Sequence, residues 1–347
     1  MSAARICLLA TLVATATTLL GCRQPAPNES ALGASAGGKG SAADGVAQEI
    51  VKSCPAGKPD DLGERDECGK KLAESTILRD ALVNPFLWGG QLADGEYDIS
   101  KSKTTRLNSL VYRRMYLSTF MFSGTYTVQT HNGKTVIHLP ATFRYALDVG
   151  EYPYPFWHRQ TKWESYEKTT EVLLFVEGQS VIGGLRSAVE DPNRPVKDHQ
   201  WDKKWTWVDS GGKPQPRVSL YAYLFPTLDV SEVDEAYRNL ESRLRPYRCL
   251  SCHSPDNISN QNPLELFNYP NQAISARHRL VNALETTQMP PGEEIPEEEL
   301  QKIIALARKF EAAGDKVLSA VGEATTESKI LALPSTAEPL HVPRKRR

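Results

Sequence analysis

Short apolar runs separated by turn residues occupy the middle of the chain. Residues 118–130 are rich in aromatic and β-branched side chains, which fit strands best. Residues 131–134 (His-Asn-Gly-Lys) follow, and an Asn-Gly pair between two such runs is typical of a tight β-hairpin. The pattern predicts further strands at residues 135–139, 141–147, 171–176, 180–182, 204–208 and 218–225. We therefore expect an antiparallel β-rich unit, a barrel or a sandwich, with flanking helices before it that extend to about residue 83.

A longer period, typical of helices, begins near residue 231. Residues 231–234 (Ser-Glu-Val-Asp) resemble an N-terminal capping box, and Pro246 ends the helix that follows. A second helix is expected at residues 271–285, and a third from about Pro296. Apolar positions recur on one face of the first helix and of the third (Val233, Ala236, Tyr237, Leu240, Leu244; Leu300, Ile303, Ile304, Ala307, Phe310). The C-terminal unit is therefore expected to be all-α, and the chain an α+β protein with two domains.

The composition is that of an ordinary globular protein. Of 347 residues, 40% are hydrophobic and 24% are charged, and the formal net charge is -1. So balanced a charge provides no bulk attraction for nucleic acid, and no nucleic-acid partner is expected. The length allows two compact units, which we place at residues 46–228 and 229–315.

The segments outside these units have different compositions. Residues 22–45 contain Pro25 and Pro27 and then mainly Ala, Gly and Ser, as flexible tethers do. Residues 316–347 are weakly patterned and end in a basic sequence, Pro-Arg-Lys-Arg-Arg. We expect this segment to be a weakly ordered tail.

Residues 1–21 have the pattern of an export signal. Arg5 precedes an apolar run over residues 6–20, too short for a comfortable membrane-spanning helix. The string Leu-Leu-Gly-Cys ending at Cys22 resembles a bacterial lipobox, which implies cleavage before Cys22 and lipidation of its thiol. Several acyl chains anchor a protein firmly in a bilayer. Arg23 replaces the Asp associated with retention in the inner membrane, so the outer membrane is favoured; the alternative is a plain signal peptide, with Cys22 incidental.

Residues 249–253 read Cys-Leu-Ser-Cys-His, the attachment signature of a c-type haem. In this chemistry the thiols of Cys249 and Cys252 add to the haem vinyl groups, and His253 becomes the proximal ligand of the iron. We therefore expect one covalently bound haem c. Attachment takes place outside the cytoplasm, so the export signal and the motif support each other.

The cysteine count adds one more expectation. The chain has 6 cysteines, and the leader, the lipid site and the haem motif use four of them. Cys54 and Cys68 remain, and an exported pair usually forms a disulfide. Closing a loop of about 15 residues would stabilise the protein by about 3 kcal/mol in the chain-entropy model.

Residues 230–315 are similar to a mono-haem cytochrome c domain of the His/Met type. The likeness rests on the haem motif after one helix and on Met289, which lies in a Met-Pro-Pro-Gly sequence before the last helix. The resemblance implies that Met289 is the distal iron ligand. His278 is the alternative distal ligand, with Met289 then a core methionine. An iron with both axial positions occupied favours one-electron transfer to redox partner proteins over substrate binding.

Two other chemistries use a Cys-x-x-Cys pair. Half of a zinc site would need a second Cys pair, and His253 with His278 is a poor substitute. A redox-active dithiol would need a strand-then-helix setting, which the sequence does not predict. Haem attachment is therefore the preferred interpretation of this Cys-x-x-Cys pair.

An aromatic segment within the β-rich unit is the other candidate site. Tyr154, Trp157 and His158 lie in a proline-containing stretch that could form a binding surface or a lid. The alternative is that the aromatics cover one end of the unit and His158 is only hydrogen-bonded. His131 and His138 have no partner pattern in the sequence.

The sequence therefore predicts a lipid-anchored, periplasm-facing electron carrier with one haem. The alternatives are a cytochrome-fused oxidoreductase or a redox or ligand sensor, in which the β-rich unit binds a small molecule. Whether the protein is an enzyme is left open, and no small-molecule substrate is indicated.

Overall fold

The computed structural model describes residues 42–89, 97–102, 104–144, 166–187, 220–244, 246–247, 249, 253, 270–289 and 295–328. All of them belong to one compact unit, Gly40–Arg347. The predicted leader, the lipidation site at Cys22 and the aromatic segment with Tyr154, Trp157 and His158 lie outside the described residues.

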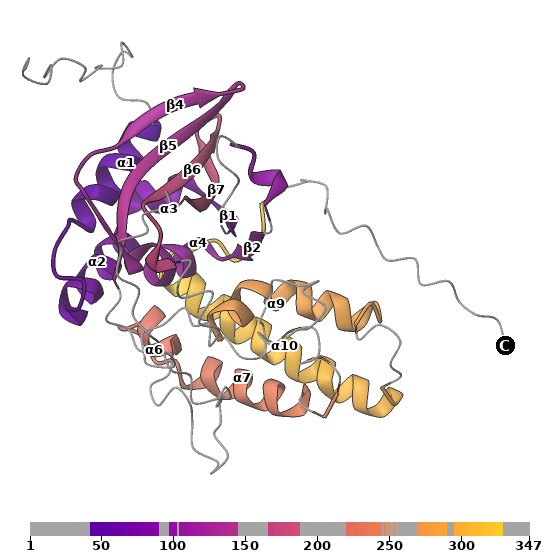
Figure 1. Cartoon of the computed structure of the whole chain (residues 1–347). Coiled ribbons are helices and arrows are strands. Elements are labelled where there is room, and N and C mark those ends of the chain that lie inside the picture. The colour runs from indigo at the N-terminus through magenta and orange to yellow at the C-terminus, as the bar shows by residue number, and fades with distance from the viewer. Residues whose placement is uncertain are drawn as a thin grey trace, which may run out of the picture. The chain divides into compact units, whose positions relative to one another are not determined.

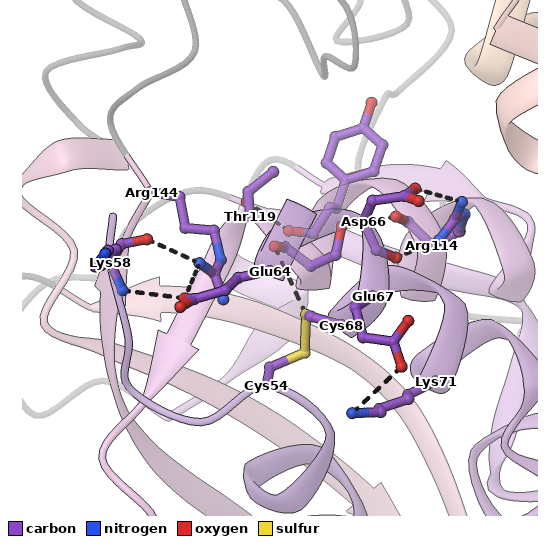
Figure 2. Close-up of a disulfide and its surroundings, with 12 residues drawn as sticks. Cys54, Lys58, Glu64, Asp66, Glu67, Cys68, Lys71, Arg114, Thr119 and Arg144 are labelled. Carbon is purple, nitrogen blue, oxygen red and sulfur yellow. Dashed lines mark hydrogen bonds and ion pairs between the residues drawn. A yellow bond between two sulfur atoms is a disulfide. The ribbon is translucent and has the colours of Figure 1, made fainter. Parts of the chain in front are cut away.

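Three helices open the described chain: α1 (Ala42–Ser53), α2 (Leu62–Glu74) and α3 (Thr76–Ala81). α2 begins where the Asp61 carboxylate accepts a hydrogen bond from the Glu64 backbone N–H at 2.9 Å, and Ser75 caps α3 in the same way. A disulfide joins Cys54, just after α1, to Cys68 in α2, and both cysteines are buried (Figure 2). The pairing predicted from the cysteine count is therefore present.

The sheet has seven strands: β1 (Leu82–Gly89), β2 (Thr104–Leu107), β3 (Phe120–Phe122), β4 (Thr127–His131), β5 (Lys134–Phe143), β6 (Glu171–Glu177) and β7 (Ser180–Ser187). Their order is β2-β1-β7-β6-β5-β3, and β4 pairs with β5. One edge of β5 pairs with β6, while β4 and then β3 pair along its other edge. Short helical turns connect these strands: η1 (Ile99–Lys101), α4 (Ser109–Val111), η2 (Tyr112–Tyr116) and η3 (Leu117–Thr119).

The hairpin predictions are confirmed where local chemistry determines the turn. Asn132 and Gly133 have φ of 50° and 78°, the two positive values that a type I′ turn requires, and they join β4 to β5. Gly178, with φ of 61°, lies in the turn between β6 and β7. The strand expected at residues 218–225 is wrong, because Leu220–Leu224 form helix α6.

The expected antiparallel sheet is also wrong. The sheet is mixed, because β1 runs parallel to β7, with Leu87 opposite Gly183 and Trp88 opposite Gly184. β1 itself was not predicted: the helical segment ends at Ala81 and the strand follows at once. Pro85 lies inside this strand, and a proline within an apolar run argues against a central strand in the sequence.

The C-terminal helices are α7 (Ser231–Leu244), α9 (Pro270–Glu285) and α10 (Glu297–Ala320). α10 packs against both α7 and α9 (Figure 1). α7 and α10 bury the apolar faces predicted from their periodicity, and Phe310 of α10 contacts both Tyr237 of α7 and Tyr221 of α6. The predicted third helix is longer than expected, since the boundary placed at residues 315/316 falls inside α10.

A separate all-α unit of the cytochrome c type is not evident, which corrects the predicted two-domain fold. The C-terminal helices share one hydrophobic core with α1–α4 and one face of the sheet. Polar contacts join the same parts: the Asn108 backbone N–H donates to Ser275 Oγ at 2.9 Å, and the Tyr221 hydroxyl donates to the Pro270 carbonyl at 2.9 Å. The apolar faces of these helices are therefore directed partly at the β-containing half of the molecule and not only at one another.

A second, smaller apolar cluster lies apart from this core. It consists of alternating strand residues and one residue of η1 (Val83, Leu87, Val136, Leu173, Phe175, Ile182, Leu185; Ile99), with Tyr97 packed on it. Leu173 and Phe175 belong to this cluster, whereas Val172 and Leu174 belong to the main core, as the two-residue period of a strand requires. The central strands are thus buried on both faces. Among the described helices, none is long and apolar enough to cross a membrane.

Candidate functional site

The Cys-Leu-Ser-Cys-His motif begins five residues after the end of α7. Leu244 ends the helix, the Tyr247 backbone N–H donates to the Leu244 carbonyl at 3.1 Å, and the chain turns into Cys249. Cys249 is half-buried and packs against the main core. The start of the motif is therefore held against the folded part of the protein.

The His253 backbone N–H donates to the Cys249 carbonyl at 2.9 Å. This is the hydrogen bond from residue i+4 to residue i of one helical turn. Residues three and four apart in such a turn project to the same side. Cys249 and His253, the first and last residues of the motif, are thus joined by a backbone hydrogen bond. Cys252 lies outside the described residues.

This arrangement fits a covalently bound haem c, judged by its donors and its backbone. The motif supplies thiols that would form thioether bonds and an imidazole that would bind the iron, and the backbone hydrogen bond from His253 to Cys249 joins its two ends. Cys249 and His253, together with Cys252, are the residues that would hold the group.

Met289 lies just beyond the C-terminus of α9. Its backbone N–H donates to the Ala283 carbonyl at 3.2 Å, and Gln288 donates to the same carbonyl at 3.0 Å. Thr287 has φ of 53°, so the chain leaves the helix through a left-handed residue. Met289 is 38% exposed and is one of three large hydrophobic residues exposed in the described chain. Its thioether is therefore not used as core packing, which removes the alternative of a core methionine.

His278, the alternative distal ligand, has other partners. Its Nδ1 lies 2.6 Å from Glu311 Oε1, and its Nε2 lies 2.8 Å from the Thr325 carbonyl oxygen and 3.1 Å from Asp315 Oδ1. Both ring nitrogens face oxygen acceptors, so neither directs a lone pair toward an iron. In this geometry His278 ties α9 to α10 and to the segment after it.

The segment after α10 closes over the same region. Glu323 is buried and forms an ion pair with the fully buried Arg113. The Glu323 carboxylate also accepts a hydrogen bond from the Ser109 hydroxyl at 3.2 Å. The Asn84 side-chain amide donates to the carbonyls of Ala324 and Thr326 at 3.2 and 3.0 Å. Residues 321–328 therefore fasten the C-terminal helices to β1 and to η2.

A histidine cluster was missed by sequence reasoning. His131 Nε2 and His138 Nε2 lie 3.1 Å apart, and His138 Nδ1 lies 3.0 Å from Glu171 Oε1. Partial burial and the neighbouring His138 imidazole lower the pKa of His131, while Glu171 opposes the shift. No partner pattern was found for these histidines in the sequence, whereas the structure brings them together. The signal was available: the Asn-Gly turn places His131 opposite Lys134, and His138 lies on the same face four residues further on.

Within the described ranges, no three His, Cys, Asp or Glu side chains converge as metal ligands.

Comparison of the chain with protein-family models, with curated proteins and with solved structures finds no match.

Proposed function

We propose that the protein is an exported, lipid-anchored c-type haem protein that passes single electrons between redox partner proteins. Residues 249–253 carry this proposal through their sequence, Cys-Leu-Ser-Cys-His, and the backbone hydrogen bond from His253 to Cys249 at 2.9 Å is the structural observation that supports it. The lipobox-like sequence at Cys22 supports export and anchoring on the periplasmic side, with the outer membrane favoured.

The residues of the chain have distinct tasks in this function. Cys249 and Cys252 would hold the haem through thioether bonds, and the His253 imidazole would bind the iron. A bound haem supplies reversible one-electron transfer between ferric and ferrous iron. Met289 is proposed as the second axial ligand, because the residue is 38% exposed and the nitrogens of His278 have oxygen partners.

Packing around residues 249–253 would restrict movement of the attachment site when the charge of the iron changes. Cys249 lies against the main core, and α7, which leads into the motif, is held by α10. A rigid, partly buried attachment site limits the rearrangement that accompanies a change of iron charge. This favours an electron carrier over a site that must open for a substrate.

Haem staining of a denaturing gel tests the attachment. The protein is expressed with a haem-maturation system, and the mature wild type is expected to retain haem after denaturation. Cys249→Ser and Cys252→Ser are expected to weaken or lose the stain. A matured, exported wild-type protein without covalent haem would refute the proposal.

The axial ligand is tested separately by absorption spectra and redox titration. Met289→Ala is expected to lose the spectroscopic signature of sulfur ligation and to lower the midpoint potential, because methionine favours ferrous iron. Leu62→Ala is the matched control, since Leu62 is also a large exposed apolar residue, 50% exposed, in α2. An unchanged Met289→Ala spectrum would exclude Met289 as the ligand while leaving the attachment result intact.

A further inference from the structure

Two imidazole rings lie against each other at the β4–β5 hairpin, with ring centroids 5.3 Å apart. Figure 1 shows the two strands of this hairpin. His131 ends β4 and His138 lies in β5, and their Nε2 atoms are 3.1 Å apart. Both side chains lie on the face of the sheet that carries Val136 of the smaller apolar cluster. The rings therefore bridge the length of the hairpin, from its turn end toward its base.

Neighbouring residues hold both rings in place. Glu171 of β6 accepts from His138 Nδ1 at 3.0 Å, so His138 carries its proton on Nδ1 and directs the lone pair of Nε2 toward His131. Tyr97 stacks on the His131 ring with centroids 3.7 Å apart and planes inclined by 14°. His138 is only 7% exposed. Neither ring can turn away without losing a packed or hydrogen-bonded neighbour.

We propose that His131 and His138 bind a divalent first-row transition metal ion of the class that prefers imidazole, such as Zn²⁺ or Cu²⁺. Imidazole nitrogen is a preferred ligand of these ions. A ligating histidine characteristically donates its other ring N–H to a carboxylate, and Glu171 has this position behind His138. This site is independent of the haem proposal and uses none of its residues.

The separation of the two nitrogens suits a shared ion. With metal–nitrogen bonds of about 2.0–2.1 Å, two ligands of a tetrahedral ion lie about 3.3–3.4 Å apart, and two adjacent ligands of a square-planar ion about 2.9 Å apart. The separation of 3.1 Å lies between these values. Binding thus requires shifts of a few tenths of an ångström and a tilt of the rings, so that their lone pairs converge.

The proton balance is simple. In the absence of metal, one hydrogen atom lies between the two Nε2 atoms. This hydrogen belongs to His131, because Glu171 keeps the proton of His138 on Nδ1. When the ion binds, that proton moves to His131 Nδ1 through solvent, and Nε2 becomes a ligand. Both rings stay neutral, no electron is transferred, and water occupies the remaining coordination positions.

A bound ion would cross-link β4 to β5 beside the turn. β4 pairs with β5 along one edge only, and its residues are largely exposed. An ion that binds the folded hairpin but not the unfolded chain raises the stability of the folded state by mass action. The site is therefore a structural or regulatory metal site, with the hairpin as the element that responds.

Isothermal titration of Zn²⁺ into the full-length protein tests the proposal, with the melting temperature as a second readout. The wild type is expected to bind one Zn²⁺ at this site and to melt at a higher temperature when it is bound. His131→Ala is expected to remove this binding and the rise in melting temperature. Glu171→Gln is expected to weaken the affinity by about 10–100-fold, the usual cost of losing such a second partner.

Gln129→Ala is the matched control, because Gln129 is exposed in the same strand and on the same face as His131. It is expected to bind Zn²⁺ like the wild type. His131 is only partly buried, at the end of a strand, so its replacement is not expected to unfold the protein. Wild-type protein that binds no Zn²⁺, or binding that is equal in His131→Ala, would overturn the proposal and leave the pair as a hydrogen bond alone.

Discussion

Glu323 and Arg113 form the most deeply buried ion pair of the described chain, and replacing Glu323 tests how the C-terminal segment is fastened. Their side chains are 2% and 0% exposed. Arg113 Nη1 also donates to the Leu72 and Ala73 carbonyls, at 2.9 and 2.6 Å. Burial lowers the pKa of the Arg113 guanidinium, and the Glu323 carboxylate opposes that shift.

The expected cost follows from what Glu323→Gln leaves behind. The amide keeps the shape and can still accept hydrogen bonds, but the buried guanidinium loses its counter-charge. Breaking a buried pair in this way costs about 3–5 kcal/mol. Since two carbonyls still bind the guanidinium, we expect a loss near the lower limit, about 3 kcal/mol, for Glu323→Gln. Glu323→Ala also removes the hydrogen bond with Ser109 and is expected to cost about 4–5 kcal/mol.

Urea denaturation, followed by circular dichroism and tryptophan fluorescence, measures the change in the free energy of unfolding. Coincident transitions by the two probes are needed before the free energies are compared. Lys316→Ala is the control, because the ion pair of Lys316 with Glu232 is exposed on both sides, at 72% and 62%. It is expected to cause no measurable loss.

A loss below about 1 kcal/mol for Glu323→Gln would refute this reasoning. It would mean that the guanidinium reaches water or another partner when the charge is removed. The segment 321–328 would then contribute little to the docking of the C-terminal helices.

Three further predictions concern the sheet and the disulfide. Replacing Cys54 and Cys68 together by Ala is expected to lower the free energy of unfolding in urea by about 3 kcal/mol, because the bridge closes a short loop; a reductant should then have no further effect on this variant. Gly183→Ala is expected to lower the free energy of unfolding by about 1–3 kcal/mol in the same assay, since a Cβ there would lie 2.6 Å from the Leu87 carbonyl oxygen. Gly45→Ala in α1 is the control. A Cβ at Gly45 would have no atom within 4 Å, so this change should be neutral or stabilising. Hydrogen bonds from Lys134 and Ser100 lower the pKa of Asp98 to about 2. The stability it contributes is therefore complete above its ordinary value of 3.8 and is lost as the pH falls toward 2. The difference in unfolding free energy between wild type and Asp98→Asn should shrink over this interval, and a constant difference would contradict the assignment.

Local signals in the sequence predicted local structure well. The Asn132-Gly133 turn was recognised because few other residues adopt two successive positive φ values. The helix Ser231–Leu244 was recognised because a sequence that resembles a capping box, the apolar spacing and Pro246 lie within one segment. The motif at residues 249–253 is also a local signal, and the haem that it predicts stays a prediction.

Long-range pairing was not predictable in this way. β1 finds its parallel partner β7 about a hundred residues later, with Leu82 opposite Val181, and nothing in either segment specifies the other. The missed pair of His131 and His138 is an intermediate case. The hairpin register puts the two side chains on one face, but only the structure shows that the rings meet and that Glu171 stands behind them.

By itself, the sequence determined where most helices and hairpins form and which cysteines pair in a disulfide, and it is the basis of the haem proposal for residues 249–253. Each of these depends on interactions between residues close in the chain. Only the tertiary structure decided that the sheet is mixed, that the C-terminal helices share a core with it, and that His278 is engaged while Met289 is exposed. Those outcomes depend on which apolar faces and buried charges meet across long separations, and many arrangements satisfy the same local pattern.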